Sequence, residues 1–469
     1  MERIKSMFGQ PKGLNEGEYE PLNNDTFTDG SGTLEGSVYD DDDDEDVAPF
    51  SKVEYGIFVL IGVAMLWAWN MFLAAAPYFQ IRFEGDEWIL GNSPSAITSI
   101  STVTNLLTMA VLTSIQSSAN YPFRIKSALY LNIFVFSVLA ISTKFFLTVS
   151  AQAYFVFLLI MVCLSALAAG FMQNGAFAFA ASFGRPEYTQ AIMTGQGIAG
   201  ILPPLVQAVS FLVVSPSTAP TSTVPPADGD AAREAGTSAF TYFLTAVAIM
   251  AVAIVSFVPL VKRHDHIIER RMTEQMAASV TSIEEAERAA RRFVSIPTLL
   301  RKLHWVALSV FTCFAVSMFF PPFTSKILSI RDSDDSSRMF SPGAFIPIAF
   351  FFWNLGDFLG RVATLLPFSL SHRPVALFGI SIARLLFLPL YLLCNIRGNG
   401  AVVSSDLFYL LLVQFPFGLT NGWLGSSAMM AAGEWVADGE REAAAGFMGT
   451  CLVGGLTAGS LLSFTANGI

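Results

Sequence analysis

Eleven apolar runs, each near or above the length of a membrane-spanning helix, dominate this chain of 469 residues. They cover approximately residues 53–79, 95–115, 125–148, 152–181, 189–214, 238–261, 304–328, 345–366, 374–395, 406–433 and 443–466. A helix needs about 20 predominantly apolar residues to cross the hydrocarbon core of a bilayer. The runs therefore predict an all-α membrane protein with eleven transmembrane helices.

The composition agrees with this prediction and excludes other classes of protein. Hydrophobic residues make up 53% of the chain and charged residues 14%, and the mean hydropathy is +0.54. A soluble chain of this length would need more charge to cover its surface. The formal net charge is −10, but the run DDDDDED at residues 40–46 carries much of it, so no nucleic-acid partner is indicated.

The cysteine and histidine positions predict neither a disulfide framework nor a metal site. The four cysteines all fall inside apolar runs and have no CxxC spacing, which is typical of small core residues. They are Cys163, Cys313, Cys394 and Cys451. The four histidines lie in or beside loops and form no HExxH pattern. We therefore expect no metal and no cofactor.

Polar segments between the runs predict the domain organisation. Residues 1–52 are acidic and lack a basic stretch followed by a short apolar one, so we expect a disordered cytoplasmic tail rather than a cleaved signal peptide. Residues 262–303 form a basic cytoplasmic loop that separates a first bundle of six helices, residues 53–261, from a second bundle of five, residues 304–469. Such a 6+5 division is typical of a two-bundle transporter with a midplane site.

The distribution of basic residues predicts the orientation. Most of the 27 Lys and Arg residues fall in the tail, in the 262–303 loop and in other segments on the same side of the membrane, and basic loops remain cytoplasmic. The N-terminus is then cytoplasmic and the C-terminus extracellular or lumenal. Tyr19-Glu-Pro-Leu22 has the form of an endosomal sorting signal, a form that also arises by chance. A plasma membrane and a vacuolar or endolysosomal membrane both stay open.

One run carries two opposite charges within the membrane. Residues 345–366 read FIPIAFFFWNLGDFLGRVATLL and contain Asp357 and Arg361. A lone charge at the bilayer centre costs about 2.5–3.5 kcal/mol on insertion scales, so such residues normally face a partner or a watery cavity. Positions i and i+4 lie on one face of a helix, so the two charges can offset each other. The pair has two interpretations. It lies at the base of a substrate pathway and binds vicinal hydroxyl groups of the substrate, or it joins two helices and has only a structural role.

Further polar side chains fall inside other runs, and each has a functional and a structural interpretation. Trp69 offers a ring face to a planar ligand, and Asn70 and Gln173 each offer a donor and an acceptor; all three are also compatible with helix packing. Asn354 precedes the charged pair by less than a turn, and we expect it to belong to the same substrate-binding site. Arg384 and Asn421 are interpreted as structural or gating residues.

Several of these stretches together are similar to one family. They are LWAWN at residues 66–70, QNG at 173–175, PEYTQAIMTGQGIAG from 186, WNLGDFLGR from 353, ARLLFLPLYLLCN from 383 and NGWL from 421. With them the chain resembles the equilibrative nucleoside transporters (solute carrier 29) from about residue 65 to residue 462. Its short outer loop without a glycosylation site, residues 80–93, departs from animal members and would suit a fungal or an organellar one.

The resemblance implies a major-facilitator-like fold of pseudo-symmetric bundles and passive exchange of nucleosides, and of nucleobases as a further option, by alternating access. It implies that Gln173 contacts the base and that Asp357 and Arg361 hold the ribose. It also implies which residues line the cavity. These are Leu66, Trp69, Asn70 and Leu73 from the first helix and Phe320 from the seventh. We expect a monomer in a lipid bilayer, with a nucleoside as its substrate.

Two other functions fit parts of the sequence. A carrier for another small polar solute, such as a sugar or an amino acid, would also need polar residues within apolar walls. An intramembrane aspartyl protease is suggested only by Leu355-Gly356-Asp357, and it would need a second membrane aspartate, whereas Asp406 lies at the end of a run. Arg361 would also disfavour the proton that two catalytic aspartates share. We therefore expect a transporter and not an enzyme.

Overall fold

A computed structural model describes residues 50–115, 120–146, 149–213, 228–278, 295–331, 338–367 and 369–463. Residues 1–49 of the predicted tail, including the Tyr19–Leu22 motif, lie outside the described residues, as do residues 279–294 of the predicted basic loop. The elements below all belong to the unit Val47–Ile469.

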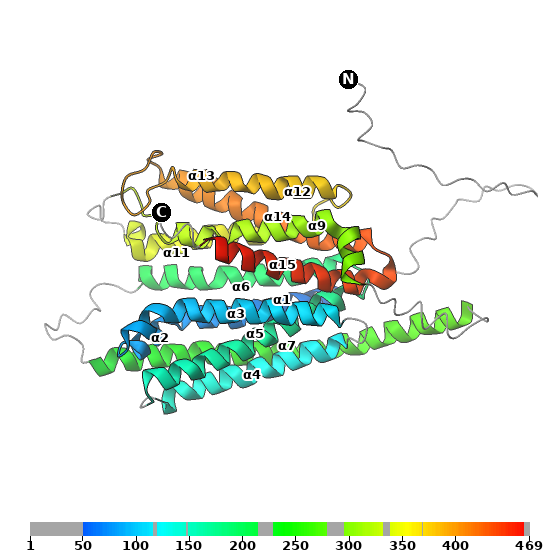
Figure 1. The fold of residues 1–469 in the computed structure, drawn as a ribbon, viewed down its shortest axis with the longest axis horizontal. Coiled ribbons are helices and arrows are strands. Elements are labelled where there is room, and N and C mark those ends of the chain that lie inside the picture. The colour runs from blue at the N-terminus through cyan, green and yellow to red at the C-terminus, as the bar shows by residue number, and fades with distance from the viewer. Residues whose placement is uncertain are drawn as a thin grey trace, which may run out of the picture. The chain divides into compact units, whose positions relative to one another are not determined.

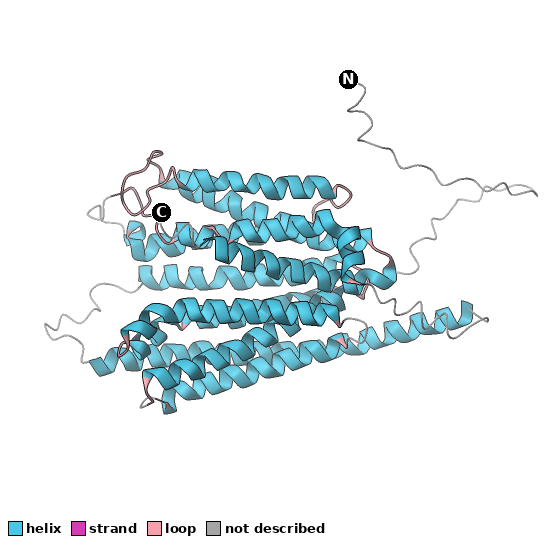
Figure 2. Ribbon diagram, in the orientation of Figure 1, coloured by secondary structure: helices cyan, strands magenta, loops and turns pink. Residues whose placement is uncertain are grey.

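The described residues form helices joined by loops and turns, with an isolated β-bridge between Ile327 and Ile396 (Figure 2). The first half of the chain forms α1 (Lys52–Ala74), α2 (Ala76–Phe83), α3 (Glu87–Ser114), α4 (Tyr121–Phe145), α5 (Ala151–Ala181), α6 (Pro186–Val213) and α7 (Asp228–Ala278). The second half forms α9 (Ile296–Ser317), α10 (Phe320–Thr324), α11 (Pro342–Ala363), α12 (Pro374–Ala383), α13 (Phe387–Tyr391), α14 (Phe415–Ala431) and α15 (Arg441–Ser463).

Short segments of other helix types join these elements. They are the 3₁₀ segments η5 (Arg338–Phe340), η6 (Arg384–Leu386), η8 (Ala432–Trp435) and η9 (Asp438–Glu440) and the π-helical segment η7 (Phe408–Gln414). Among the described residues, 10 helices are long and apolar enough to cross a membrane. The remaining predicted run, residues 406–433, consists of η7 and α14 in direct succession. The all-α fold with eleven membrane-crossing segments is therefore confirmed.

Proline explains why several spans are interrupted. Proline has no backbone N–H and its ring clashes with the preceding turn, so a helix breaks or changes its winding just before it. The first span breaks between α1 and α2, ahead of Pro77, and the seventh between α9 and α10, ahead of Pro321. The ninth span passes through η6 before Pro389, and the tenth widens into η7 before Pro416.

The helices around the predicted basic loop are longer than the apolar runs indicated. α7 continues beyond residue 261 to Ala278, and α9 begins at Ile296 rather than near residue 304. Lys, Arg, Glu and Met favour helix as strongly as apolar residues do, so the charged continuation of α7 remains helical. Pro297 occupies the first turn of α9, where proline is well tolerated. Hydrophobicity alone therefore misplaced both boundaries.

The cysteines do not all belong to the core. Cys313 and Cys394 are buried as predicted, Cys451 is half-buried and Cys163 is exposed on α5, where its sulfur lies 3.7 Å from Thr104 Oγ1. The prediction for Cys163 was wrong because hydrophobicity does not distinguish a helix face that points into the bundle from one that points away from it. Among the described residues, no three His, Cys, Asp or Glu side chains gather as a metal ion would require.

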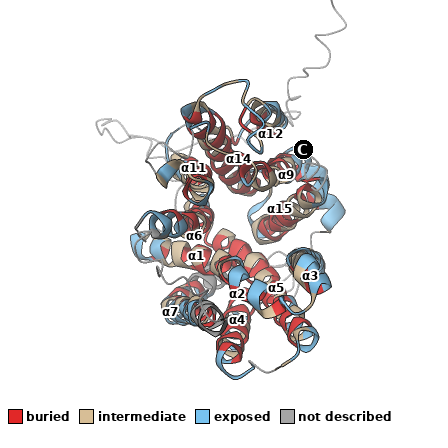
Figure 3. Ribbon diagram, turned by 90° about the vertical axis from the view of Figure 1, so that its left-hand side faces the viewer, coloured by how far each residue is buried: buried red, intermediate tan, exposed pale blue. Residues whose placement is uncertain are grey.

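The helices form two groups that meet along two seams. Figure 3 shows α9, α11, α12, α14 and α15 on one side and α1 to α7 on the other. At the first seam α6 packs against α11 and α14, and at the second α15 packs against α3 and α5 (Figure 1). Residues far apart in the sequence thus become neighbours at the boundary between the two bundles.

Glycines bring α11 and α14 unusually close together. A Cβ atom on Gly422 would lie 1.8 Å from the backbone oxygen of Asp357, and one on Gly418 would lie 2.0 Å from that of Trp353. Small residues at such crossings allow backbones to approach and pack where lipid offers no hydrophobic drive for association. The close approach places residues of α14 within hydrogen-bonding distance of Asp357.

We predict that Gly422→Ala lowers the thermal unfolding midpoint of the purified protein in detergent. The added methyl group forces the two helices apart, and overpacking of this kind costs about 1–3 kcal/mol. Gly379→Ala in α12 is the matched control, because a Cβ there meets no atom within 4 Å. Equal midpoints for the two variants would contradict the close packing of α11 and α14.

Candidate functional site

The predicted ion pair forms and is buried. Nε of Arg361 lies 2.7 Å from Oδ2 of Asp357, and the two residues are 6% and 4% exposed. Both side chains project from the same face of α11, one turn apart, as the i, i+4 spacing predicted. Each charge therefore has its partner inside the bundle.

The second oxygen of Asp357 is held by the neighbouring helix. Nδ2 of Asn421 in α14 donates a hydrogen bond of 2.7 Å to Oδ1. Because Oδ2 already accepts from Arg361, both carboxylate oxygens have fixed donors and the plane of the carboxylate is set. A carboxylate has about four lone-pair positions, so two remain for another donor.

Arg361 also reaches across the first seam into the other bundle. Its Nη1 donates to the backbone oxygen of Met193 at 2.9 Å and to Oε1 of Gln196 at 3.2 Å, both on α6. Nη2 has no hydrogen-bond partner among the described residues. One guanidinium thus neutralises Asp357, joins the two bundles and still keeps donor capacity.

Gln190 and Gln196 of α6 were not singled out from the sequence, although they complete this polar cluster. Gln190 is fully buried, accepts from the Tyr55 hydroxyl at 2.7 Å, and donates to Thr194 Oγ1 and to the backbone oxygen of Arg361. Two glutamines in one membrane-spanning run were a usable signal, because buried polar residues in a bilayer require partners.

The residues expected from the first helix share one face of α1 but differ in exposure. Leu66 and Trp69 are half-buried, Asn70 is buried and Leu73 is 54% exposed. Asn70 Nδ2 donates to the backbone oxygen of Ala199 in α6 at 2.7 Å. This bond supports a helix-joining role for Asn70.

Gln173 lies on α5 and pairs with another amide. Nδ2 of Asn105 in α3 donates to its Oε1 at 3.2 Å. Within the described part of the chain, no hydrogen bond or ion pair joins Gln173 to the Asp357 cluster. The structure therefore brings Asp357, Arg361 and Asn421 together, and leaves Gln173 as a separate polar position of the first bundle.

Phe320 packs against α11, and Asn354 belongs to that helix. The Phe320 ring stacks on Trp353 with a centroid distance of 3.9 Å and an interplanar angle of 3°. Asn354 donates to the backbone oxygen of Phe350 at 2.8 Å, and its Oδ1 lies 2.7 Å from the position that a Cβ on Gly200 would occupy. Asn354 therefore faces α6 at the first seam, and Phe320 of α10 packs against α11.

Arg384 is one of the largest fully buried side chains. Its Nη1 donates to the backbone oxygen of Cys313 at 2.5 Å, its Nη2 approaches the backbone oxygen of Phe417 at 3.4 Å, and its guanidinium carbon lies 4.8 Å from the centre of the Phe417 ring. It therefore connects the ninth span to α9 and α14, which supports the structural interpretation of this residue.

A second polar cluster lies at the other seam. The hydroxyls of Thr113 in α3 and Thr450 in α15 are 2.7 Å apart, and Asn174 Nδ2 donates to Thr113 at 3.3 Å. Asn174 in turn accepts from Arg124, which also donates to backbone oxygens near the end of α3. Sequence analysis did not single out these residues, because polar side chains near the ends of spans are common.

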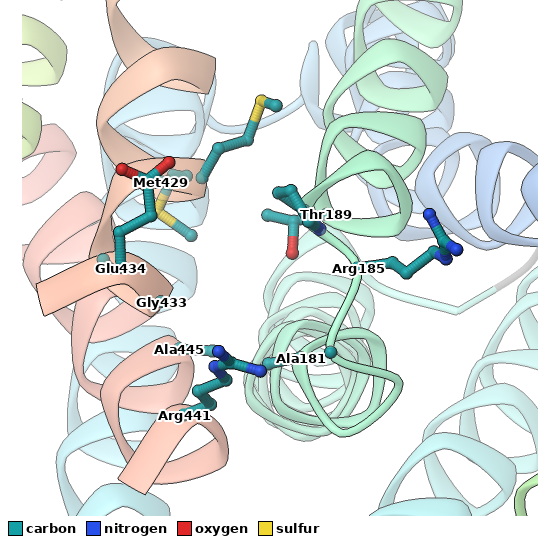
Figure 4. Close-up of a pocket in the computed structure, with 12 residues that line it drawn as sticks. Ala181, Arg185, Thr189, Met429, Gly433, Glu434, Arg441 and Ala445 are labelled. Carbon is teal, nitrogen blue, oxygen red and sulfur yellow. The ribbon is translucent and has the colours of Figure 1, made fainter. Parts of the chain in front are cut away.

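A small cavity opens between the two bundles at the end where α5 turns into α6. It has a volume of about 100 Å³ and is lined from one side by residues such as Arg185 and Thr189, and from the other by Met429, Glu434 and Arg441. Figure 4 shows the Arg441 side chain extending from α15 toward Ala181 of α5. None of the predicted substrate residues lines this cavity.

Comparison with solved structures agrees with the two-bundle arrangement. The fucose:proton symporter FucP of the major facilitator superfamily, in an outward conformation, matches with a TM-score of 0.54 and 14% identity over 88% of this chain and 93% of that chain. The proton:xylose symporter XylE, of the same superfamily, matches with a TM-score of 0.54 and 11% identity over 88% of each chain. At these identities the likeness shows a shared fold.

Comparison of sequences is more specific. The chain is 28% identical to the nucleoside transporter FUN26 of Saccharomyces cerevisiae over 89% of this chain and 86% of that protein. It is 26% identical to equilibrative nucleoside transporter 1 of Rattus norvegicus over 88% of this chain and 96% of that protein. The family model described as nucleoside transporter matches residues 159–467, which is more than half of the chain. The chain therefore belongs to the nucleoside transporter family.

Proposed function

We propose that this protein carries nucleosides passively across a membrane, and that Asp357 and Arg361 form the part of the site that holds the ribose. The proposal rests on the Asp357 carboxylate, which is buried at the boundary between the two helical bundles. Its plane is fixed by two hydrogen bonds, and two of its lone-pair positions remain for a ligand. The names of the related transporters support a nucleoside as the substrate.

The chemistry of the pair suits vicinal hydroxyls. Asp357 can accept from two ribose hydroxyl groups with its remaining lone pairs, and Arg361 Nη2 can donate to a sugar or ring oxygen. Hydrogen bonds to charged groups are among the stronger hydrogen bonds in proteins, so Asp357 and Arg361 can bind an uncharged solute firmly.

The position of Arg361 suggests how binding couples to movement. Its Nη1 holds α6 of the opposite bundle, so a ligand that draws the guanidinium toward itself weakens a contact between the bundles. We infer that the two bundles rock about this seam and expose the site to each side in turn. A ligand shifts such an equilibrium only by contacts that differ between the two states, and we propose that the bonds from Arg361 to α6 are such contacts.

For the base, we propose that Gln173 supplies a donor. Because Asn105 occupies its Oε1, the Nε2 group is the part of the amide that remains for an acceptor on the base. We further infer that Leu66, Trp69, Leu73, Phe320 and Asn354 contribute the walls of the pathway.

The orientation and the home membrane also remain proposals. The excess of basic residues predicts a cytoplasmic N-terminus and a C-terminus outside the cell or in a lumen. The cavity between the bundles would then open on the cytoplasmic side, because the α5–α6 turn and the N-terminus of α1 lie on the same side. We expect a monomer in the plasma membrane or in a vacuolar or endolysosomal membrane.

The protease alternative is excluded by the family and by the position of Asp406. Its Oδ1 accepts from the backbone N–H of Ile330 and its Oδ2 from the Ser329 hydroxyl, so it holds a loop between spans. If the protein instead carries sugars or amino acids, these solutes should compete with nucleosides for uptake.

We predict that Asp357→Ala and Arg361→Ala each reduce saturable uridine and adenosine uptake about 10- to 100-fold in proteoliposomes, because hydrogen bonds to charged groups contribute about 1.5–3 kcal/mol. Asp265→Ala, at an exposed position of α7, is the control for loss of an aspartate and should transport normally. Competition by nucleosides but not by sugars or amino acids should accompany uptake. Normal flux in both variants would place the site elsewhere.

Gln173→Ala should change the preference among bases more than the dependence on ribose. The variant loses one donor to the base and no contact to the sugar. Competition of labelled uridine uptake by a panel of nucleosides, together with their 2′-deoxy and 3′-deoxy forms, measures both properties. An unchanged ranking of bases would remove Gln173 from the site.

The pair should also show a non-additive effect on stability. Removing one partner of a buried ion pair costs about 3–5 kcal/mol, because the other charge is left without compensation. We therefore expect Asp357→Ala/Arg361→Ala to unfold at a higher temperature than Arg361→Ala alone. If the double variant regains stability but not uptake, the pair serves transport as well as architecture; regained uptake would make it a clip between helices only.

A further inference from the structure

The buried guanidinium of Arg384 is not explained by the ion pair or by the proposed substrate contacts. Its hydrogen bonds go to the backbone oxygens of Cys313 and Phe417 and to the Cys313 sulfur, and none of them goes to a carboxylate. A buried charge costs free energy unless it is hydrogen-bonded, and ionisable residues within the membrane often have a function. The contacts of Cys313 connect Arg384 to the proposed site.

Cys313 connects Arg384 to the site. Its sulfur accepts from Nη1 of Arg384 at 3.0 Å and lies 3.4 Å from Oδ1 and 3.7 Å from the backbone oxygen of Asn421, so the side-chain oxygen is the nearer acceptor for the thiol. Cys313 is fully buried in α9, and Asn421 is buried in α14. The contacts therefore run without a break from the ninth span to the residue that holds Asp357.

The two ends of the Asn421 amide are not interchangeable here. Its Nδ2 donates to Asp357 Oδ1 at 2.7 Å, and its Oδ1 faces the thiol. Turned over, the amide would place an oxygen against the carboxylate oxygen and an NH₂ group against the thiol. The Cys313 donor therefore favours the orientation in which Asn421 can hold Asp357.

We propose that Arg384 and Cys313 are positioning residues for the sugar site. Arg384 orients the Cys313 thiol, the thiol orients the Asn421 amide, and the amide sets the plane of the Asp357 carboxylate. This inference rests on the proposed role of Asp357 as the ribose-binding group. Its consequence is that discrimination between ribonucleosides and deoxyribonucleosides depends on a side chain that touches no substrate.

The test compares three variants of buried cysteines in the full-length protein in proteoliposomes. Cys313→Ala removes the donor to Asn421 but keeps the backbone oxygen that accepts from Arg384. Cys313→Ser restores a group that can accept from Arg384 and donate to Asn421. Cys394→Ala is the matched control, because the Cys394 thiol is buried in the same bundle and donates to the Leu390 oxygen of its own helical turn.

We expect Cys313→Ala to raise the KM for uridine about 2- to 10-fold, the range that one ordinary hydrogen bond accounts for. Its ratio of uridine to 2′-deoxyuridine uptake and its ratio of uridine to 3′-deoxyuridine uptake should both fall toward one, and its ranking of bases should not change. Cys313→Ser should recover both ratios, and Cys394→Ala should not alter them. Cys313→Val, which also lacks the donor but leaves no cavity, replaces Cys313→Ala if the smaller residue lowers the yield of folded protein.

Three outcomes overturn the proposal and identify what failed. If Asp357→Asn loses the ribose preference while Cys313→Ala and Cys313→Val keep it, the sugar site stands and the role of Cys313 and Arg384 is wrong. The same holds if Cys313→Ser behaves like Cys313→Ala, because a purely steric effect would then explain both. If Asp357→Asn itself keeps the ribose preference, the proposed function of the pair fails first.

Discussion

The charge balance at Asp357 and Arg361 is the interaction on which the second bundle depends. Neither charge is tolerable alone among apolar helices, and each is made tolerable by the other within one turn of α11. The bonds beyond the pair are directional: Asn421 holds the free carboxylate oxygen, and α6 supplies a carbonyl and an amide oxygen to the guanidinium. The position of α11 relative to α14 and α6 therefore depends on these directional hydrogen bonds as well as on the packing of side chains. We refer to this group of bonded residues as the polar centre.

In the proposed mechanism, this polar centre serves both the architecture and the transport of the substrate. The seam between α6 and α11 would then have to be specific enough to close and weak enough to open. A guanidinium with several donors suits that requirement, because it can exchange one acceptor for another while remaining neutralised by Asp357. The second seam relies on hydroxyl and amide contacts around Thr113 and Thr450, which carry no charge across the boundary.

The sequence was sufficient for the fold and for the central pair, and insufficient for the contacts around it. Hydrophobic length and the i, i+4 rule are local properties, so the spans and the Asp357–Arg361 pair could be predicted. The partners of the pair come from α6 and α14, and which residues of two distant helices meet depends on the glycine crossings and on helix rotation. For the same reason the pairing of Gln173 with Asn105, the α7 boundary and the exposure of Cys163 could not be predicted from periodicity or hydrophobicity.

The glycine crossing of α11 and α14 has one further consequence. Backbones in such close contact leave little freedom to slide, so the two helices would move together in the proposed rearrangement of the bundles. The carboxylate and the amide that orients it would then keep their mutual geometry whichever side of the membrane the proposed site faces. A carrier with no energy source gains from such an invariant half-site, since the solute meets the same binding surface on entry and on exit, and net flow is decided by concentration alone.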